Sequence, residues 1–235
     1  MKKFVISKRL QAVCRFVSRG ARIIDVGTDH AFVPICLLKS GQVDKAWACD
    51  VNPGPLKIAE NNALLHGLNE KIVFYLSDGL SSCDCYNNLY DHVVIAGMGG
   101  ELIYDIIRRS DYICDKRPLL ILQPMTMQPF LRNMLVSNGY SILFDDVVSE
   151  DKKFYTIIVC RYEDSISHLS DFEVSFGKGI AKKVTEKDPE SMNYLKYERE
   201  VLNRVSEGKN LGGLNHDLED RLISEISALL NEEFE

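Results

Sequence analysis

The sequence predicts an α/β fold in which helices cover a mostly parallel seven-stranded sheet, followed by a C-terminal α-helical hairpin. Short apolar runs without in/out alternation, typical of parallel strands buried on both faces, alternate with helix-like segments. Acidic residues and glycines directly follow several of these runs, at the edge where open parallel sheets bind ligands. After residue 163 no further strand is predicted, and charged segments with helical periodicity take over.

Helices and strands are predicted in regular alternation. The first helix is predicted because Leu10, Val13 and Val17 share one helical face, and Gly20 ends it. Pro55 marks the start of a later helix, and Gly139 closes another. The predicted strands are residues 22–26, 46–50, 72–76, 92–96, 119–122, 140–148 and 155–162. The predicted helices are residues 7–18, before the first strand, and residues 32–40, 55–66, 101–109 and 129–138 between strands.

The last two strands differ from the others in their connection. Only a tight turn around residues 150–153 separates them, so they are predicted to form an antiparallel pair. Such a hairpin places one antiparallel strand in an otherwise parallel sheet.

The C-terminal part is predicted to be a separate helical unit, so we divide the chain into residues 1–162 and 163–235. Residues 163–175 are predicted as a short polar connection and residues 177–179 as a turn. A charged helix is expected over residues 189–207, ended by a glycine-bearing stretch. Apolar residues then recur every three or four positions up to the C-terminus, which predicts a second, antiparallel helix and hence a coiled-coil hairpin.

Composition excludes several classes of protein. Of the 235 residues 46% are hydrophobic and 26% charged, ordinary values that argue against disorder. No apolar stretch is long enough to span a membrane, and the N-terminus lacks the features of a signal peptide. The seven cysteines show no metal-binding spacing, and Cys83 and Cys85 are too close together for a Cys-x-x-Cys hook. We therefore expect a cytoplasmic protein with reduced thiols, no metal and no membrane association.

Charge is distributed unevenly. The net charge is −6, with 19 basic and 17 acidic residues in positions 1–162 against 9 and 17 in positions 163–235. The first 24 residues contain seven basic side chains, among them Lys2 and Lys3, and no acidic one. This segment is either a surface that faces phosphate groups or an ordinary solvated helix face.

The acidic residues that end successive strands predict an adenosine-bearing ligand. Asp25 precedes Gly27, where the backbone can approach a ligand closely and the following helix presents free N–H groups. Asp50, 25 residues later, stands where a carboxylate accepts hydrogen bonds from both ribose hydroxyls. Asp78 ends the third strand, where an acid can reach an adenine amino group. The segment Gly97-Met98-Gly99-Gly100 follows the fourth strand, beside the expected reaction centre.

The first turn distinguishes between two classes of cofactor. It contains Asp29 where a nicotinamide-binding fingerprint has its second glycine, and a carboxylate there would repel a diphosphate. The cationic, zwitterionic end of S-adenosylmethionine would be tolerated. Asp29 is therefore a candidate cofactor ligand, a candidate carboxylate that stabilises a cationic product, or a cap on the following helix.

Several motifs together resemble the bacterial tRNA adenine N1-methyltransferase family (TrmK), whose members methylate adenine 22. The motifs, in order, are Ser7-Lys8-Arg9-Leu10, Asp25-Val26-Gly27-Thr28-Asp29-His30-Ala31, Asp78-Gly79, Ile95-Ala96-Gly97-Met98-Gly99-Gly100 and Leu122-Gln123-Pro124. The resemblance covers nearly the whole chain and includes the C-terminal hairpin. It implies a class I Rossmann-like methyltransferase that uses S-adenosyl-L-methionine and acts on tRNA.

The resemblance also implies roles for individual residues. The cofactor would be held by Asp25, Gly27, Thr28, Asp29, His30, Asp50, Val51, Asp78, Gly79, Ala96, Gly97 and Met98. The RNA would be contacted by Lys8, Arg9, Arg15, Gln123, Pro124 and Tyr155. Two positions depart from the family pattern: Met125 stands where asparagine is frequent after Gln-Pro, and Thr156 stands where glutamate often follows tyrosine.

The chemistry expected is direct attack by a ring nitrogen. Adenine N1 has a free lone pair at neutral pH, so the enzyme mainly aligns it with the methyl group and the sulfur. N1 lies on the pairing edge, so the target base must leave its stack. A methyltransferase of another substrate and a non-catalytic RNA-binding module with this fold remain alternatives. The hairpin is expected to clamp tRNA or to mediate self-association, in a monomer or a weak dimer.

Overall fold

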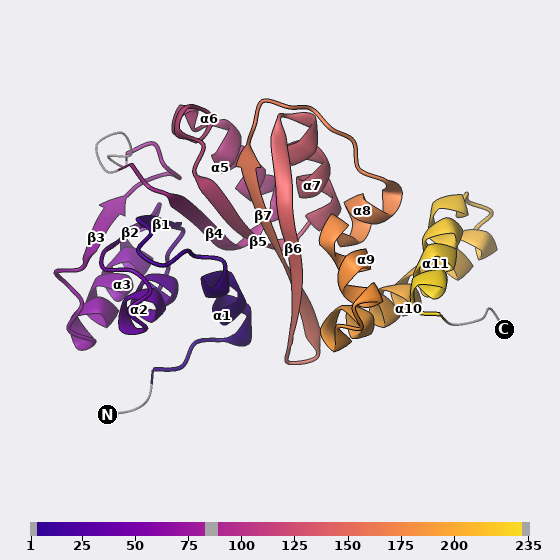
Figure 1. The fold of residues 1–235 in the computed structure, drawn as a ribbon, viewed down its shortest axis with the longest axis horizontal. Helices are drawn as coiled ribbons and strands as arrows, with labels where there is room; N and C mark the ends of the chain where they lie inside the picture. Colours follow the sequence, from indigo (N-terminus) through magenta and orange to yellow (C-terminus); the bar gives the residue numbers. More distant parts are fainter. Residues whose placement is uncertain (1–3, 83–88, 232–235) are drawn as a thin grey trace.

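The computed structural model describes residues 4–82 and 89–231, and it confirms the predicted α/β class. One seven-stranded sheet has the order β3-β2-β1-β4-β5-β7-β6 (Figure 1). The strands are β1 (Ile23–Val26), β2 (Ala46–Asp50), β3 (Ile72–Leu76), β4 (His92–Gly99), β5 (Leu119–Thr126), β6 (Tyr140–Glu150) and β7 (Lys153–Tyr162). The helices are α1 (Lys8–Arg15), α2 (Phe32–Lys39), α3 (Pro53–Leu65), α5 (Gly100–Arg108), α6 (Asp111–Lys116), α7 (Gln128–Ser137), α8 (Asp171–Phe176), α9 (Lys178–Thr185), α10 (Pro189–Leu211) and α11 (Asp217–Leu229).

The central strands are parallel and buried on both faces, which explains their unbroken apolar character. Neighbouring residues of one strand enter different cores: Ile23 joins a cluster with α1, α2 and α3, whereas Ile24 joins a cluster with α5, α6 and α7. All four residues of β1 are buried. The strand ends are therefore held rigidly from both sides.

The predicted antiparallel hairpin is present at the edge of the sheet. Glu150 pairs with Lys153, and the two residues between them have positive φ angles of 51° and 62°, as a tight hairpin turn requires. Strand β7 runs antiparallel to both β5 and β6, so it is the reversed strand of the sheet.

The connection after β7 was predicted incorrectly. Residues 163–188 contain two helices, α8 and α9, where the sequence suggested a polar connection and a turn. Ser170 and Glu173 form a capping box that starts α8, with the Glu173 backbone N–H 3.1 Å from Ser170 Oγ. Gly177, with a φ angle of 106°, joins the two helices. Short helix α6 was also missed, because six residues are too few to show a period.

The C-terminal hairpin is present, but its first helix is longer than predicted. Helix α10 continues through Gly208 to Leu211, and the chain reverses at Gly212 and Gly213 before α11 packs back against it (Figure 1). Together with α8 and α9, these helices enclose a third apolar cluster that includes Val147 of β6. The helical region is thus packed against the outermost strand of the sheet.

Buried charges reinforce this junction. The Arg132 side chain of α7 is fully buried, and its Nε lies 3.0 Å from Asp145 Oδ1 of β6. The same guanidinium donates to the backbone carbonyls of residues 174, 175 and 176 at the end of α8. Asp145 Oδ2 in turn accepts from the backbone N–H of Lys178, the first residue of α9.

Cys83 and Cys85, as well as Lys2 and Lys3, lie outside the described residues. The five cysteines within the described ranges are free thiols. In the part of the chain that the structure describes, no helix is long and apolar enough to cross a membrane. Within the same ranges, His, Cys, Asp and Glu side chains form no group of three or more suited to a metal ion.

Candidate active site

A cavity of about 430 Å³ lies at the carboxyl ends of β1 to β4, where the sequence predicted a ligand site. All twelve predicted cofactor-binding residues line this cavity. Arg9 of α1 also lines it, as do Leu102 and Ile106 of α5. The volume is in the usual range of small-molecule sites.

Asp25 is the most deeply buried acid of the cavity. Its carboxylate accepts a hydrogen bond of 2.6 Å from the Thr28 hydroxyl and is only 4% exposed. Burial raises the pKa of Asp25 to about 6; the Thr28 hydrogen bond lowers it, and the charge of Asp50 raises it further. A buried carboxylate of this kind favours a cationic ligand, because a positive group would restore its lost solvation.

Asp50 organises the first turn as well as facing the cavity. Its Oδ2 accepts from the backbone N–H of Asp29 at 3.3 Å, and its Oδ1 accepts from that of Asn52 at 2.9 Å. The backbone N–H groups of Gly27 and Thr28 both donate to the Cys49 carbonyl. The backbone N–H groups of residues 27–29 are therefore already paired within the protein. The remaining lone pairs of Asp50 are what a ribose could use.

Asp29 and His30 form the outer rim of the cavity. The Asp29 carboxylate is 63% exposed and lies 3.4 Å from His30 Nε2. The interpretation of Asp29 as a helix cap is wrong, because Ala31 is the N-cap of α2 and no side chain caps that helix. His30 stacks on Phe32 with ring centroids 5.0 Å apart.

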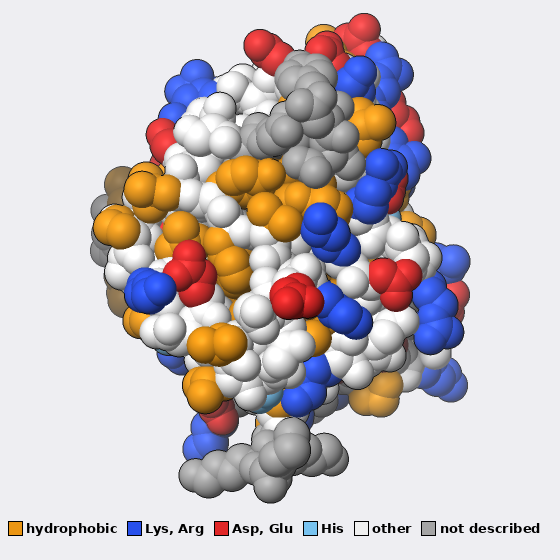
Figure 2. Space-filling view, turned by 90° about the vertical axis from the view of Figure 1, so that its left-hand side faces the viewer, with side chains coloured by type: hydrophobic (Ala, Val, Ile, Leu, Met, Phe, Trp, Pro, Cys, Tyr) orange, Lys and Arg blue, Asp and Glu red, His pale blue; other side chains and the backbone are white. Residues whose placement is uncertain are grey.

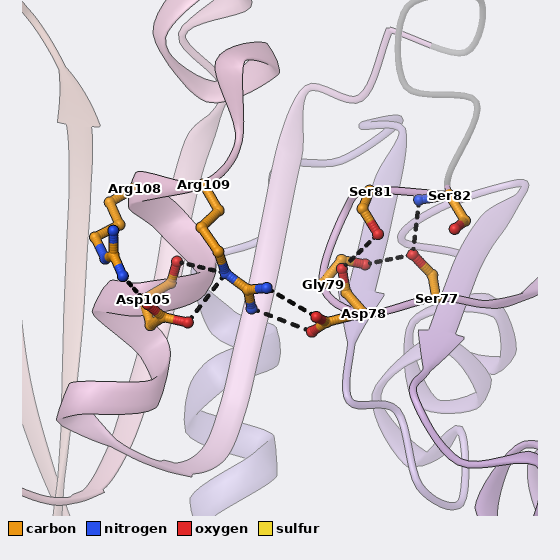
Figure 3. Close-up of polar contacts among 8 residues, drawn as sticks. All are labelled: Ser77, Asp78, Gly79, Ser81, Ser82, Asp105, Arg108 and Arg109. Carbon is orange, nitrogen blue, oxygen red and sulfur yellow. Dashed lines mark hydrogen bonds and ion pairs between the residues drawn. The ribbon is translucent and has the colours of Figure 1, made fainter.

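The opposite end of the cavity is formed by the turn after β3 and by α5. Asp78 is bound there by Arg109 in a two-pronged ion pair with distances of 2.8 and 3.1 Å (Figure 3). Arg109 lowers the pKa of Asp78, so this carboxyl stays ionised. No local pattern indicated this pair, because its members are 31 positions apart.

Two glycines keep the middle of the cavity open. Gly27 has a φ angle of 71°, and a Cβ there would lie 1.9 Å from the terminal methyl of Met98. Gly97 has a φ angle of 83° and stands beside Arg9. Only backbone and apolar side chains surround the cavity at residues 96–98, between the two acidic ends. Carboxylates at both ends suit S-adenosylmethionine, whose ribose, adenine and amino group need acceptors.

Gln123 and Pro124 occupy a different place from the one predicted. Gln123 is fully buried: Oε1 accepts from Arg9 Nη1 and from the Gly97 backbone N–H, and Nε2 donates to the Pro124 carbonyl. Pro124 is buried as well. Neither side chain is placed to contact RNA. Gln123 instead positions Arg9, whose guanidinium carbon lies 5.7 Å from the centre of the half-buried Tyr155 ring.

The basic residues of α1 separate onto two sides. Arg9 faces the cofactor cavity, whereas Lys8 and Arg15 line a second cavity of about 560 Å³ together with Glu190 of α10. Arg15 also pairs with Asp146 of β6 at 3.3 Å. Positions 8 and 15 are seven residues apart and share one helical face, which position 9 does not.

Sequence reasoning missed several residues of the cavity wall. Ser77, 4% exposed, donates to the Gly79 carbonyl at 2.9 Å and shapes the turn that presents Asp78. Leu102 and Ile106 come from α5, and their spacing of four residues was the available signal. A Cβ at Gly79 would lie 3.0 Å from Ile106 Cγ2, so α5 packs closely on this turn.

Comparisons with known proteins agree with this site. A family model described as "Methyltransferase domain" matches residues 6–158. The tRNA (adenine(22)-N(1))-methyltransferase of Bacillus subtilis (strain 168) is 30% identical over 177 residues, covering 75% of this chain and 74% of that protein. Streptococcus pneumoniae Sp1610, solved in complex with S-adenosyl-L-methionine, is 34% identical with a TM-score of 0.81, over 96% of this chain and 100% of that one.

M. capricolum TrmK, solved in complex with S-adenosyl-homocysteine, is 28% identical with a TM-score of 0.74, over 96% of this chain and 98% of that one. The sequence and the fold of this chain thus match those of the two solved structures over nearly the whole chain, including the C-terminal helices. The acids that end β1, β2 and β3 surround one cavity, as the family resemblance implied. The chain belongs to the bacterial tRNA (adenine(22)-N(1))-methyltransferase family.

Proposed function

We propose that this protein transfers the methyl group of S-adenosylmethionine to N1 of adenine 22 in tRNA. The observation that carries the proposal is the cavity between Asp25, Asp50 and Asp78, in a chain of this family. When bound, S-adenosylmethionine supplies a methyl group on a positively charged sulfur. We assign Asp50 to the ribose, Asp78 to the adenine, and Asp25 with the residue 27–30 turn to the methionine part.

The protein's own contribution to the reaction is mainly positioning. Residues 96–98 form an apolar wall with backbone polar groups at the centre of the cavity. The reaction needs no side-chain carboxylate or amide at this place. Attack by a ring nitrogen requires no prior removal of an amino proton, so alignment and exclusion of water suffice. Asp29 at the rim is our candidate for stabilising the cationic product ring.

Arg9 and Tyr155 are our candidates for the target base. The two side chains lie next to each other, Arg9 lines the cavity, and Gln123 accepts a hydrogen bond from Arg9. An arginine over an aromatic ring can stack on a base that has been turned out of its RNA helix. Lys8 and Arg15 would contact phosphates farther along the RNA.

The surface favours recognition of RNA through individual basic side chains. On the face shown in Figure 2, basic side chains lie mostly along one side, while apolar side chains gather near the centre and a few acidic ones stand between them. Among the residues coloured there, the basic side chains form no continuous patch on this face. Phosphate contacts on it would come from individual side chains.

The domain division and the location are part of the same proposal. We assign residues 1–162 to the methyltransferase domain and residues 163–235 to a helical appendage, because α8 to α11 supply nearly all of one apolar cluster, to which the sheet contributes Val147. Since tRNA is a cytoplasmic substrate, we place the enzyme in the cytoplasm.

The proposal is tested by incubating the protein with S-adenosylmethionine and an unmodified tRNA that has adenine at position 22. We expect 1-methyladenosine in the digested RNA by mass spectrometry, and its loss when that adenine is changed to guanine. Bound cofactor with no 1-methyladenosine would overturn the assignment of substrate. A different methylated nucleoside would do the same and would identify the correct base.

The raised pKa of Asp25 predicts a pH dependence of cofactor affinity. A cation stabilises the ionised carboxylate, so affinity is complete above the free-protein pKa of about 6 and is lost as the pH falls through it. We expect the affinity for S-adenosylmethionine to be constant from pH 7 to 8 and to fall by up to about tenfold per unit below pH 6. Titration calorimetry from pH 5 to 8 measures this.

The control for this pH dependence is Asp25→Asn, which cannot ionise. This variant should bind more weakly, and its affinity should lack the fall below pH 6. An unchanged fall in the variant would assign the titration to another group.

A further inference from the structure

Arg109 makes an ion pair that joins two walls of the cofactor cavity. It is the C-cap residue of α5, and its two Nη atoms lie 2.8 and 3.1 Å from the two carboxylate oxygens of Asp78. Its Nε lies 3.0 Å from Asp105 Oδ2, one helical turn earlier. Figure 3 shows the guanidinium held between these two acids, with Arg108 turned away on the far side of Asp105. The planar group is therefore fixed in orientation on both sides.

Arg109 binds Asp78 from outside the cavity. Ser77, Asp78 and Gly79 line the cavity wall, together with Ile106 of α5, whereas Arg109 is not part of that wall. The turn itself is rigid, because Ser77 Oγ donates to the Gly79 carbonyl and accepts from the Ser82 backbone N–H at 3.0 Å. Any effect of Arg109 on a ligand must then act through the Asp78 carboxylate.

The ion pair sets the hydrogen-bonding character of Asp78. A carboxylate has about four lone-pair positions, of which a two-pronged arginine occupies two. The others remain available to a ligand in the cavity. Arg109 also lowers the pKa of Asp78, so the group accepts hydrogen bonds and does not donate them.

We propose that Arg109 is a specificity-determining positioning residue, which holds Asp78 so that its free lone pairs select a 6-aminopurine in the cofactor over a 6-oxopurine. The inference rests on the proposed S-adenosylmethionine site and adds to it the residue that sets base selectivity. An adenine amino group donates to the held carboxylate. The O6 atom of hypoxanthine presents lone pairs to it and is repelled.

The test compares two ligands that differ only on the N1/C6 edge of the purine: S-adenosylhomocysteine and S-inosylhomocysteine, in which hypoxanthine replaces adenine, with O6 in place of the amino group and a hydrogen on N1. Their dissociation constants are measured by titration calorimetry on the full chain. We expect the protein to prefer the adenine ligand by roughly tenfold or more. In Arg109→Ala this preference should fall by about threefold or more, because Asp78 is no longer held.

The matched control is Arg108→Ala. This substitution removes the same charge from the same end of α5 and also breaks an ion pair with Asp105, 2.5 Å long. The ion pair between Arg109 and Asp78 stays intact. Its ligand preference should stay within about twofold of the parent protein. Asp78→Asn should abolish most of the preference, and adding Arg109→Ala to it should produce no further change, since Arg109 acts through that carboxylate.

Three results would overturn the inference alone. Equal weakening of both ligands by Arg109→Ala would assign Arg109 a purely structural role. Equal loss of preference in Arg108→Ala would make the effect one of general charge. A parent protein that binds both ligands equally would show that Asp78 does not contact the base. Failure to bind either ligand would instead overturn the proposed cofactor site itself, and the inference with it.

Discussion

Replacing Arg132 by alanine is expected to lower the free energy of unfolding by about 3–5 kcal/mol, because it leaves the Asp145 carboxylate buried without its partner. Both side chains are almost completely buried, with exposures of 0% and 1%. The change also removes the donor to three backbone carbonyls at the end of α8, which adds unsatisfied polar groups to the cost. Urea unfolding followed by circular dichroism measures the difference.

The matched control is Arg221→Ala, which breaks an exposed ion pair of 2.9 Å with Asp171 in the same helical region. The Arg221 and Asp171 side chains are 68% and 55% exposed, so we expect a loss below about 1 kcal/mol. Equal losses in the two variants would contradict the view that the buried pair fastens α8 and α9 to the sheet.

Replacing Asp50 by alanine is expected to raise the dissociation constant for S-adenosylmethionine by roughly 100-fold or more. Two hydrogen bonds to a charged acceptor are lost with the ribose hydroxyls, and each is worth about 1.5–3 kcal/mol. The variant also frees the backbone N–H groups of Asp29 and Asn52, which the carboxylate now holds. Calorimetric titration with the cofactor measures the change, and a melting curve establishes that the variant is folded.

Asp44→Ala is the control for Asp50, because this exposed acid precedes the same strand at its other end. It should leave the cofactor affinity unchanged within about twofold. Asp50→Asn keeps the shape and one oxygen acceptor, so its affinity should fall between those of the parent protein and Asp50→Ala. A folded Asp50→Ala variant with near-normal affinity would contradict the assignment of the ribose to Asp50 at the end of β2.

Local pattern was sufficient for most of the fold. The unbroken apolar runs of β1 and β2 predicted strands covered on both faces, since such runs are stable only where no side of the sheet meets water. The order of acids after successive strands likewise predicted one site, because parallel strands bring their carboxyl ends to the same edge. Short helices α6 and α8 escaped because fewer than two turns show no periodicity.

The sequence by itself therefore determined the class of fold, the family and twelve of the residues that line the cofactor cavity. Only the tertiary structure decided what each of these side chains is bound to. In the folded protein Asp78 forms an ion pair with Arg109, and the buried Gln123 accepts a hydrogen bond from Arg9. Lys8 and Arg15 line a second cavity. The physical reason is that strand order and helical period are repeated in neighbouring residues, whereas an ion pair between distant elements depends on packing that no local pattern encodes.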